Sequence, residues 1–280
     1  MKPSLPAFEP AVVTEVLVRF LRAEAQKFGF TRGVLGVSGG IDSAVAAALA
    51  ARAFGASNVL GLLLPYKTSS PSSERLGRDL CEKFEIPTER IDITAMVDGY
   101  LKAVSLAVGR KEDRLRAGNV MARSRMIVVF DHSARDGSIV LGTSDKTEQL
   151  LGYTTWYGDS ASAINPLGDL YKTQVYALAE HLGVPKEICE QRPTPDLWPG
   201  QSAEAEMGIR YEEVDALLYE LVDRRRRPED LVRHGHRRKL VEWILHRVPA
   251  NQYKRRLPIV AKVSARTVNL DFRYLRDWGR

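Results

Sequence analysis

The residues best suited to chemistry form one short segment, Gly36-Val37-Ser38-Gly39-Gly40-Ile41-Asp42-Ser43. It joins an apolar run that predicts a strand to an alanine-rich run that predicts a helix, so its N–H groups meet a helix start. Such a loop binds anions, its glycines let a phosphate approach the backbone, and Ser38 and Ser43 add hydroxyl donors. The spacing fits neither GxxxxGK[ST] nor GxGxxG, which disfavours an NTP-cleaving P-loop and a plain Rossmann site.

Asp42 is the unusual member of this loop. A carboxylate beside a phosphate is repelled unless a divalent cation lies between them, so Asp42 predicts Mg²⁺. A second polar cluster, Gly142-Thr143-Ser144-Asp145-Lys146-Thr147-Glu148, follows another predicted strand. We expect Thr143 and Glu148 at the carboxyl edge of the sheet, with Glu148 sharing the metal. The alternative is that Glu148 only pairs with a helix dipole.

The elements that must position these clusters alternate along the chain. Strands are predicted at 34–37, 58–64, 90–93 and 139–142, and helices at 9–28, 42–54, 72–84, 95–108, 115–135 and 145–151. This alternation predicts an α/β fold, an open parallel sheet with helices on both faces and right-handed crossovers. A loop-rich stretch at 153–169 is followed by predicted helices at 171–182, 185–189, 211–226, 228–234 and 237–247.

No repeat or linker divides the chain, so we predict a single domain over residues 1–280. Its core spans about 30–200 and a helical C-terminal extension about 201–280. The composition, 44% hydrophobic and 27% charged, is ordinary for a globular protein. The N-terminus lacks a signal-peptide pattern and apolar runs are short, which predicts a soluble, cytoplasmic protein without a membrane partner.

The cysteines and the basic residues indicate no further chemistry. Cys81 and Cys189 form no metal-binding motif, and we interpret both as buried or incidental thiols. The net charge of +6 is concentrated late, at 224–227, 233–239 and 254–256. A solvated helical face is the favoured explanation, and a site for phosphate-bearing ligands is the alternative. We expect no nucleic-acid partner.

The loop carries a resemblance to a known superfamily. Residues 38–43 match SGGxDS, the signature of the PP-loop (N-type) ATP pyrophosphatases, which split ATP into AMP and pyrophosphate. The superfamily includes NAD, GMP, asparagine and argininosuccinate synthetases and several tRNA-modifying enzymes, so the loop indicates only this half-reaction. Its members share an adenine nucleotide alpha hydrolase-like fold.

Further motifs resemble one branch, the NAD synthetase family, in order and spacing over roughly residues 33–260. They are GN-x2-AR-x-RM at 118–126, GTSDKTE at 142–148, YGD at 157–159, NPL at 165–167, YKTQV at 171–175 and PTPDL at 193–197. The resemblance implies ATP-dependent amidation of deamido-NAD by ammonia. The products would be NAD, AMP and pyrophosphate, formed through an NAD-adenylate.

Carried over to the nucleotide end, the resemblance implies that residues 36–43 cradle the ATP phosphates and that Asp42 and Glu148 hold Mg²⁺. The implied ATP contacts are Thr143, Lys172 and Thr194. Lys172 would also act in catalysis, because its charge offsets that of the departing pyrophosphate. Taken alone, a lysine at a helix start is more often solvated.

At the acceptor end, the resemblance implies that Arg123, Tyr253 and Lys254 bind deamido-NAD. Taken alone, Arg123 reads as an ion-pair residue. Asp159 would be catalytic by positioning ammonium and accepting its proton. The chain departs from the family pattern at three positions: Trp156 replaces a lysine, Ala163 an aspartate and Tyr253 a histidine. Trp156 could replace a polar contact by stacking on a ring.

Three alternatives and two partner questions remain open at this point. The chain could be a PP-loop ligase that adenylates another carboxylate, a tRNA-modifying or sulfur-transfer enzyme, or a non-enzymatic nucleotide-binding module. The second would normally need catalytic cysteines or an RNA-binding module, and neither is evident. Glutamine-dependent relatives carry an extra nitrilase-like amidase domain, for which 280 residues leave no room. The resemblance therefore implies free ammonia or a separate glutaminase partner, and also a homodimer.

Overall fold

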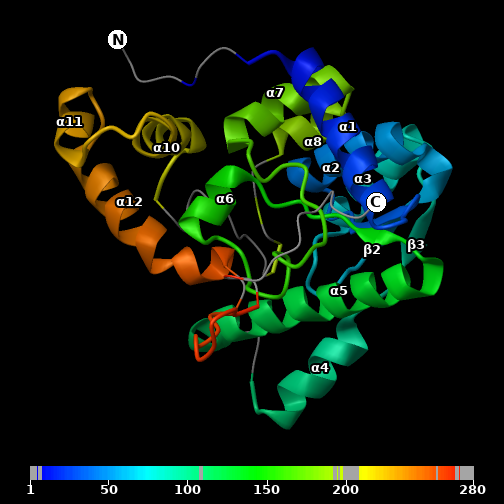
Figure 1. The fold of residues 1–280 in the computed structure, drawn as a ribbon. Coiled ribbons are helices and arrows are strands. Elements are labelled where there is room, and N and C mark those ends of the chain that lie inside the picture. Colours follow the sequence, from blue (N-terminus) through cyan, green and yellow to red (C-terminus); the bar gives the residue numbers. More distant parts are fainter. Residues whose placement is uncertain are drawn as a thin grey trace.

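The fold is built on a parallel four-stranded sheet (Figure 1), seen in a computed structural model that describes residues 5, 8–106, 110–191, 194, 196–197, 208–256, 258–268 and 271. The strand order is β3-β2-β1-β4, formed by β1 (Gly33–Gly36), β2 (Val59–Leu63), β3 (Thr88–Arg90) and β4 (Ile139–Val140). Strand order reverses between β1 and β4, and open α/β sheets bind ligands at the carboxyl end of such a crevice. The predicted fold class is confirmed.

Helices cover both faces of this sheet. One face carries α1 (Pro10–Lys27), α2 (Ile41–Phe54), α3 (Pro71–Lys83), α7 (Lys172–Leu182) and α8 (Lys186–Glu190). The other carries α4 (Thr94–Ala103) and α5 (Arg114–Asp136). A third group comprises α6 (Lys146–Leu151), α10 (Tyr211–Leu218), α11 (Pro228–Arg233) and α12 (Arg238–Ala250). Short turns of helix occur at Ala56–Asn58, Lys111–Asp113, Tyr219–Asp223 and Gln252–Arg255.

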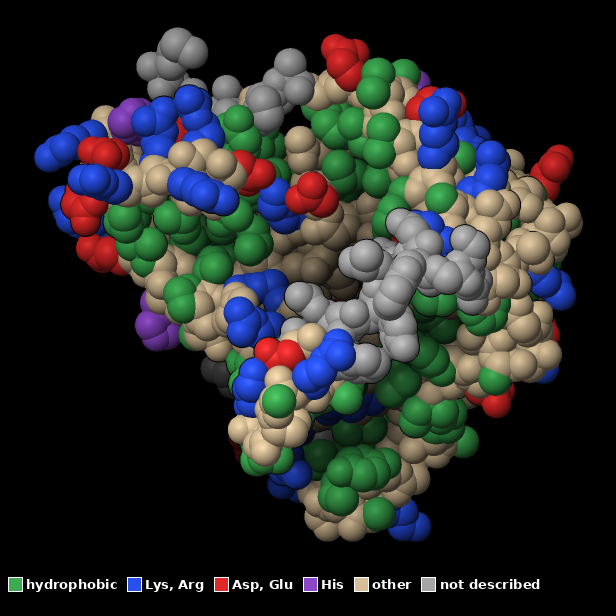
Figure 2. All heavy atoms as spheres, in the orientation of Figure 1, with side chains coloured by type: hydrophobic (Ala, Val, Ile, Leu, Met, Phe, Trp, Pro, Cys, Tyr) green, Lys and Arg blue, Asp and Glu red, His purple; other side chains and the backbone are tan. Residues whose placement is uncertain are grey.

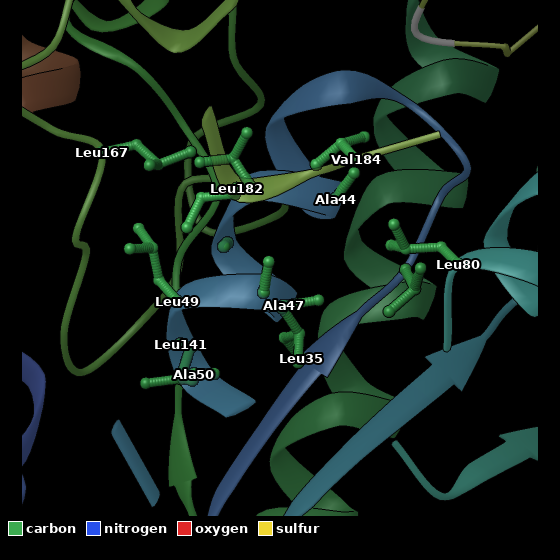
Figure 3. Close-up of a cluster of buried hydrophobic side chains, with 14 of the residues drawn as sticks. Leu35, Ala44, Ala47, Leu49, Ala50, Leu80, Leu141, Leu167, Leu182 and Val184 are labelled. Atoms are coloured by element: carbon green, nitrogen blue, oxygen red, sulfur yellow. The ribbon is translucent and has the colours of Figure 1, made fainter. Parts of the chain in front are cut away.

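Alternate strand residues divide the core in two, because successive side chains of a strand point to opposite faces. Val34 and Leu62 pack with α4 and α5, whereas their neighbours Leu35 and Leu63 pack with α2. Figure 3 shows the alanines of α2 between β1 and α7, and these small side chains let the helix lie close to both. None of the described helices is long and apolar enough to cross a membrane.

The C-terminal helices pack against α6 and the start of α7 through a third cluster that includes Leu151 and Tyr171. Several basic residues near the C-terminus donate to backbone carbonyls at the end of α6. The bonds run from Arg255 to Gln149 O and Leu150 O, from Arg247 to Leu151 O, and from Lys254 to Gly152 O and Thr154 O, at 2.7–3.0 Å. These cations cap carbonyls that the helix leaves without partners. The division of the chain near residue 200 stays a prediction.

Four predicted segments differ in detail from the structure. The third strand ends at Arg90, although Ile91 N–H still donates to Leu63 O at 3.0 Å. The helix predicted at 211–226 stops at Leu218 and continues as one π-helical turn. The loop-rich stretch contains Ile164, which pairs in parallel with Leu141 and extends the sheet. The predicted helix at 95–108 ends at Ala103, and residues 107–108 lie outside the described residues.

Gly39 gives the first testable prediction, because its φ is +81° and a Cβ built there would lie 2.1 Å from Ser73 O on α3. We expect Gly39→Ala to lower the free energy of unfolding by about 1–3 kcal/mol through backbone strain, and further by displacing α3. Gly36→Ala is the matched control, since its Cβ would meet no atom within 4 Å. Urea unfolding measures both; equal midpoints for the two variants would refute the strain.

Candidate active site

The glycine loop leaves the carboxyl end of β1 and turns directly into α2. Its own serines hold its shape: Ser43 Oγ donates to Gly40 O at 2.9 Å, and Gly40 N–H donates to Ser38 Oγ at 3.2 Å. Ser38 N–H donates to Ser43 Oγ at 3.2 Å. The hydroxyls of Ser38 and Ser43, which the sequence analysis expects to face a phosphate, thus form hydrogen bonds within the loop. The loop is preorganised, which reduces the entropy cost of binding an anion.

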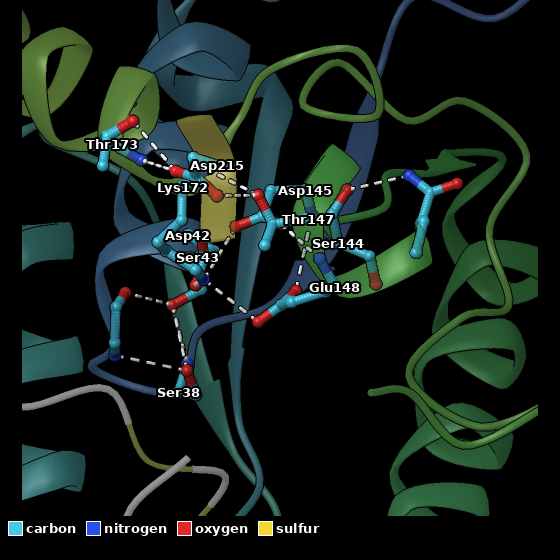
Figure 4. Close-up of polar contacts among 12 residues, drawn as sticks. Ser38, Asp42, Ser43, Ser144, Asp145, Thr147, Glu148, Lys172, Thr173 and Asp215 are labelled. Atoms are coloured by element: carbon cyan, nitrogen blue, oxygen red, sulfur yellow. Dashed lines mark hydrogen bonds and ion pairs between the residues drawn. The ribbon is translucent and has the colours of Figure 1, made fainter. Parts of the chain in front are cut away.

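A buried lysine lies among three carboxylates next to this loop (Figure 4). Lys172 Nζ lies 2.7 Å from Asp42 Oδ2, 2.9 Å from Asp145 Oδ2 and 3.0 Å from Glu148 Oε1. The Lys172 side chain is 1% exposed and Asp145 is fully buried. The structure thus brings together three residues predicted from separate motifs: Asp42 on α2, Glu148 on α6 and Lys172 on α7.

Asp145 is the member of this cluster that the sequence analysis did not single out. It is the N-cap of α6: its Oδ1 accepts from Glu148 N–H at 2.7 Å, and Glu148 Oε2 accepts from Asp145 N–H at 3.4 Å. The D-x-x-E spacing within GTSDKTE is the signature of such a capping box, so the signal was present. The box fixes the first turn of α6, and with it the direction of Glu148.

The charges in this cluster shift each other's protonation. Burial raises the pKa of Asp145 and Glu148, against the pull of the Lys172 ammonium. Burial alone would lower the pKa of Lys172, but the three carboxylates outweigh it and hold that pKa well above its usual value. Lys172 therefore stays charged at any physiological pH. The Tyr211 ring, 5.4 Å from Nζ, adds a cation–π contact.

The same carboxylates have the chemistry of a Mg²⁺ site. One oxygen each from Asp42, Asp145 and Glu148 lies within 4.8 Å of the others. Asp42 Oδ1 is buried and has no hydrogen-bond partner within the part of the chain that is described. Hard divalent cations prefer carboxylate oxygens, so these residues fit the predicted metal.

A cavity of about 740 Å³ opens from this cluster across the carboxyl edge of the sheet. Figure 2 shows the surface hollowed near the middle of this face. Six other predicted site residues line the cavity: Thr143, Thr194, Arg123, Asp159, Tyr253 and Lys254. Of the loop residues 36–43, Gly39 does not line the cavity, because it packs against Ser73 on α3. A cavity of this volume is typical of small-molecule binding sites.

Several side chains predicted to bind deamido-NAD instead contact other parts of the protein. Arg123 donates to Trp156 O at 3.2 and 3.3 Å. The Trp156 ring stacks on Tyr157, with 4.7 Å between centroids, and meets the edge of Tyr253 at 5.3 Å. Lys254 holds backbone carbonyls, as described above. These contacts shape the cavity mouth, and direct contacts to deamido-NAD stay a prediction.

Asp159 faces this cavity from the turn that follows Trp156. Its Oδ1 accepts from Thr155 N–H at 2.7 Å. Desolvation raises the pKa of the Asp159 carboxyl, while the bonds from Thr155 and the charge of Lys254 oppose that shift. A carboxylate so placed can accept a proton near the reacting atoms.

This is the arrangement of an ATP-cleaving PP-loop enzyme. An open parallel sheet carries the glycine loop, the carboxylate cluster and the buried lysine at its switch point. The model of the NAD synthase family matches residues 13–258, and the chain belongs to that family.

Known proteins of this kind resemble the chain over most of its length. The NH(3)-dependent NAD(+) synthetase of Chlorobium phaeobacteroides (strain BS1) is 50% identical over 268 residues, which are 96% of this chain and 95% of the relative. The structure of NMN synthetase from Francisella tularensis matches with a TM-score of 0.80 and 31% identity, covering 91% of this chain and 100% of that one. NH3-dependent NAD synthetase from Campylobacter jejuni matches with a TM-score of 0.76, 31% identity and the same coverage.

Removing the buried ammonium gives the second prediction. We expect Lys172→Met to lower the free energy of unfolding in EDTA by about 3–5 kcal/mol, because breaking a buried pair leaves uncompensated charge. Added Mg²⁺ should restore more stability to this variant than to the parent protein, since the ion replaces the missing charge. Urea unfolding with EDTA and with Mg²⁺ measures both effects.

Lys146→Met is the control for this experiment, because Lys146 pairs with Asp223 and Asp169 outside the cluster. Its stability should respond to Mg²⁺ as the parent does. A Lys172→Met protein whose stability is indifferent to Mg²⁺ would count against the metal site.

Proposed function

We propose that this chain catalyses the ATP-dependent amidation of deamido-NAD with ammonia, giving NAD, AMP and pyrophosphate through an NAD-adenylate. In reaction class it is a ligase that forms a carbon–nitrogen bond. The observation that carries the proposal is a single cavity whose wall includes the loop and the Lys172 cluster as well as Arg123 and Asp159. The 50% identity to an NH(3)-dependent NAD(+) synthetase supports it.

Adenylation comes first, because a carboxylate is a poor electrophile until one of its oxygens becomes part of a good leaving group. The nicotinate carboxylate attacks the α-phosphorus of ATP, and pyrophosphate leaves. The Lys172 ammonium, together with those N–H groups at 36–43 that make no bond within the protein, would offset the charge that develops on the phosphates. When bound, Mg²⁺ on Asp42 and Glu148 would neutralise phosphate charge. Thr143 and Thr194 would contact the nucleotide from the cavity wall.

Amidation follows at the other end of the cavity. Ammonia attacks the acyl carbon of the adenylate, and AMP leaves with the oxygen that joined the two. Nitrogen arrives mostly as ammonium at neutral pH and must lose a proton to become a nucleophile. Asp159 would hold this cation and accept the proton. Free ammonia or a separate glutaminase as its source, and a cytoplasmic location, stay predictions.

The acceptor is tested by incubating purified protein with ATP, Mg²⁺, ammonium and deamido-NAD, and measuring AMP, pyrophosphate and NAD. Nicotinic acid mononucleotide runs in parallel, because one structural relative is an NMN synthetase. We expect deamido-NAD to support the higher kcat/KM. AMP formation with the mononucleotide or another carboxylate, but not with deamido-NAD, would overturn the acceptor assignment.

The third prediction concerns Asp42, whose carboxylate lies between the loop and Lys172. Asp42→Asn removes the carboxylate charge that we propose binds Mg²⁺, and it should lower NAD formation by about 10²–10³-fold, the range that oxyanion-type electrostatic stabilisation contributes. Asp79→Asn is the control: Asp79 is 46% exposed on α3 and pairs with Arg75. It should leave the rate unchanged. An active Asp42→Asn enzyme would contradict the metal role.

We also propose a homodimer, as the family resemblance implies. Several large apolar side chains are exposed on or next to α4 and α5: Met96, Tyr100, Val104, Leu115, Ile127 and Phe130. Figure 2 shows hydrophobic side chains gathered low on this face, where α4 lies in Figure 1. An exposed apolar patch on a globular protein commonly marks an interface. A second copy of this chain is the occupant we propose.

The fourth prediction tests this interface. The parent protein should elute with twice the mass of the chain in size-exclusion chromatography with light scattering. A variant with Tyr100→Glu and Phe130→Glu should elute as a monomer, because each carboxylate would be buried without a partner. Val12→Glu, on α1 and 61% exposed, should remain dimeric. A monomeric parent protein would refute the proposal.

A further inference from the structure

A second buried carboxylate lies behind the lysine cluster, on the C-terminal helix α10. Asp215 is fully buried. Its Oδ1 accepts from Thr147 Oγ1 at 2.6 Å, and its Oδ2 accepts from Thr173 N–H at 2.8 Å and Thr173 Oγ1 at 2.9 Å (Figure 4). One side chain thus ties together the first turns of two helices, α6 and α7.

The threonines that Asp215 holds are the immediate neighbours of the site residues. Thr147 precedes Glu148, and Thr173 follows Lys172. Thr147 Oγ1 also accepts from Lys172 N–H at 3.1 Å, so the chain of bonds runs from α10 through α6 to the backbone of Lys172. Moving Asp215 therefore moves both Glu148 and Lys172, which have to stay 3.0 Å apart across two helices.

Packing alone does not account for a carboxylate at this position. The other inward-facing residues of α10, Val214, Leu217 and Leu218, are apolar and fully buried. Burying a carboxylate costs free energy that an apolar residue of similar volume would avoid. The three hydrogen bonds offset part of that cost and in return set the relative position of α6 and α7.

We propose that Asp215 is a positioning residue for the reaction: it sets the register between Glu148 on α6 and Lys172 on α7. This inference rests on the proposed activity. Asp215 acts through Thr147 and Thr173 and needs no contact with substrate. It also gives the C-terminal helices a part in the active site, together with Tyr211, one turn earlier on α10, whose ring covers Lys172 Nζ.

The fifth prediction compares Asp215→Asn with variants of its partners. An asparagine has one acceptor oxygen, so its amide N–H₂ must either face the N–H of Thr173 or force the Thr147 hydroxyl to accept where it now donates. We expect kcat to fall on the order of 10²-fold, the cost of misplacing a catalytic group by about 1 Å. The KM for deamido-NAD should stay within about twofold, because the acceptor end is untouched, and the Mg²⁺ concentration for half-maximal rate should rise.

The partners separate positioning from loss of folding. Thr147→Val removes the hydroxyl that bridges Asp215 and Lys172 and should lower kcat similarly, while Thr147→Ser, which keeps the hydroxyl, should restore it. Combining Asp215→Asn with Thr147→Val should cost little more than either alone, because both break one network. Leu217→Ala is the matched control on α10: it should lower the unfolding midpoint and leave kcat and the Mg²⁺ dependence intact.

A readout without turnover keeps this inference distinct from the proposed function. Calorimetry with Mg²⁺ and the non-cleavable analogue α,β-methylene-ATP should give a Kd about tenfold weaker for Asp215→Asn and unchanged for Leu217→Ala. A parent protein that makes no NAD overturns the function, and the calorimetric comparison still tests Asp215. Equal Kd and kcat for Asp215→Asn and the parent, or equal losses in Leu217→Ala, would overturn the positioning role.

Discussion

The buried ammonium of Lys172 is the contact on which the remaining parts of the site depend. It lies among carboxylates contributed by α2 and by the start of α6, and it belongs to α7. When all three carboxylates are ionised, one lysine leaves an excess of negative charge, and burial makes that excess costly. The Mg²⁺ that we propose on Asp42 and Glu148 would relieve that excess. The charge of this cluster is thus suited to binding a metal ion together with a nucleotide.

The sheet and its helices supply the geometry that this charge cluster needs. The switch between β1 and β4 directs the glycine loop and the GTSDKTE segment toward the same crevice. The largely buried α2, with its small side chains, lets α7 come close enough for Lys172 to reach Asp42. The C-terminal helix α10 contacts this cluster through Asp215, which binds Thr147, and through Tyr211, whose ring lies against Lys172 Nζ. Their basic residues serve mainly as ion-pair partners and carbonyl caps.

The parts of the site that the sequence predicts are those encoded locally. Asp42 could be found because it stands in a loop between strand and helix, and Glu148 because it follows a strand whose carboxyl end must face the same way. Asp145 carries a capping-box pattern, which predicts a helix start but gives no sign that its other oxygen faces Lys172. Asp215 had no local signal, since its partners lie 42 and 68 residues away. Long-range hydrogen bonds of this kind depend on tertiary packing, as do the π-helical turn after Leu218 and the pairing of Ile164.

The short helix α6 joins the two ends of the cavity. Its first turn holds Glu148 in the charge cluster, and its last carbonyls are held by Arg247, Lys254 and Arg255 where the chain leaves for Trp156 and Asp159. Six residues of helix span about 9 Å, and one residue more or fewer would rotate everything beyond it by about 100°. The length of α6 therefore sets the distance between Glu148 and the segment that carries Trp156 and Asp159, and side-chain contacts hold both ends of the helix.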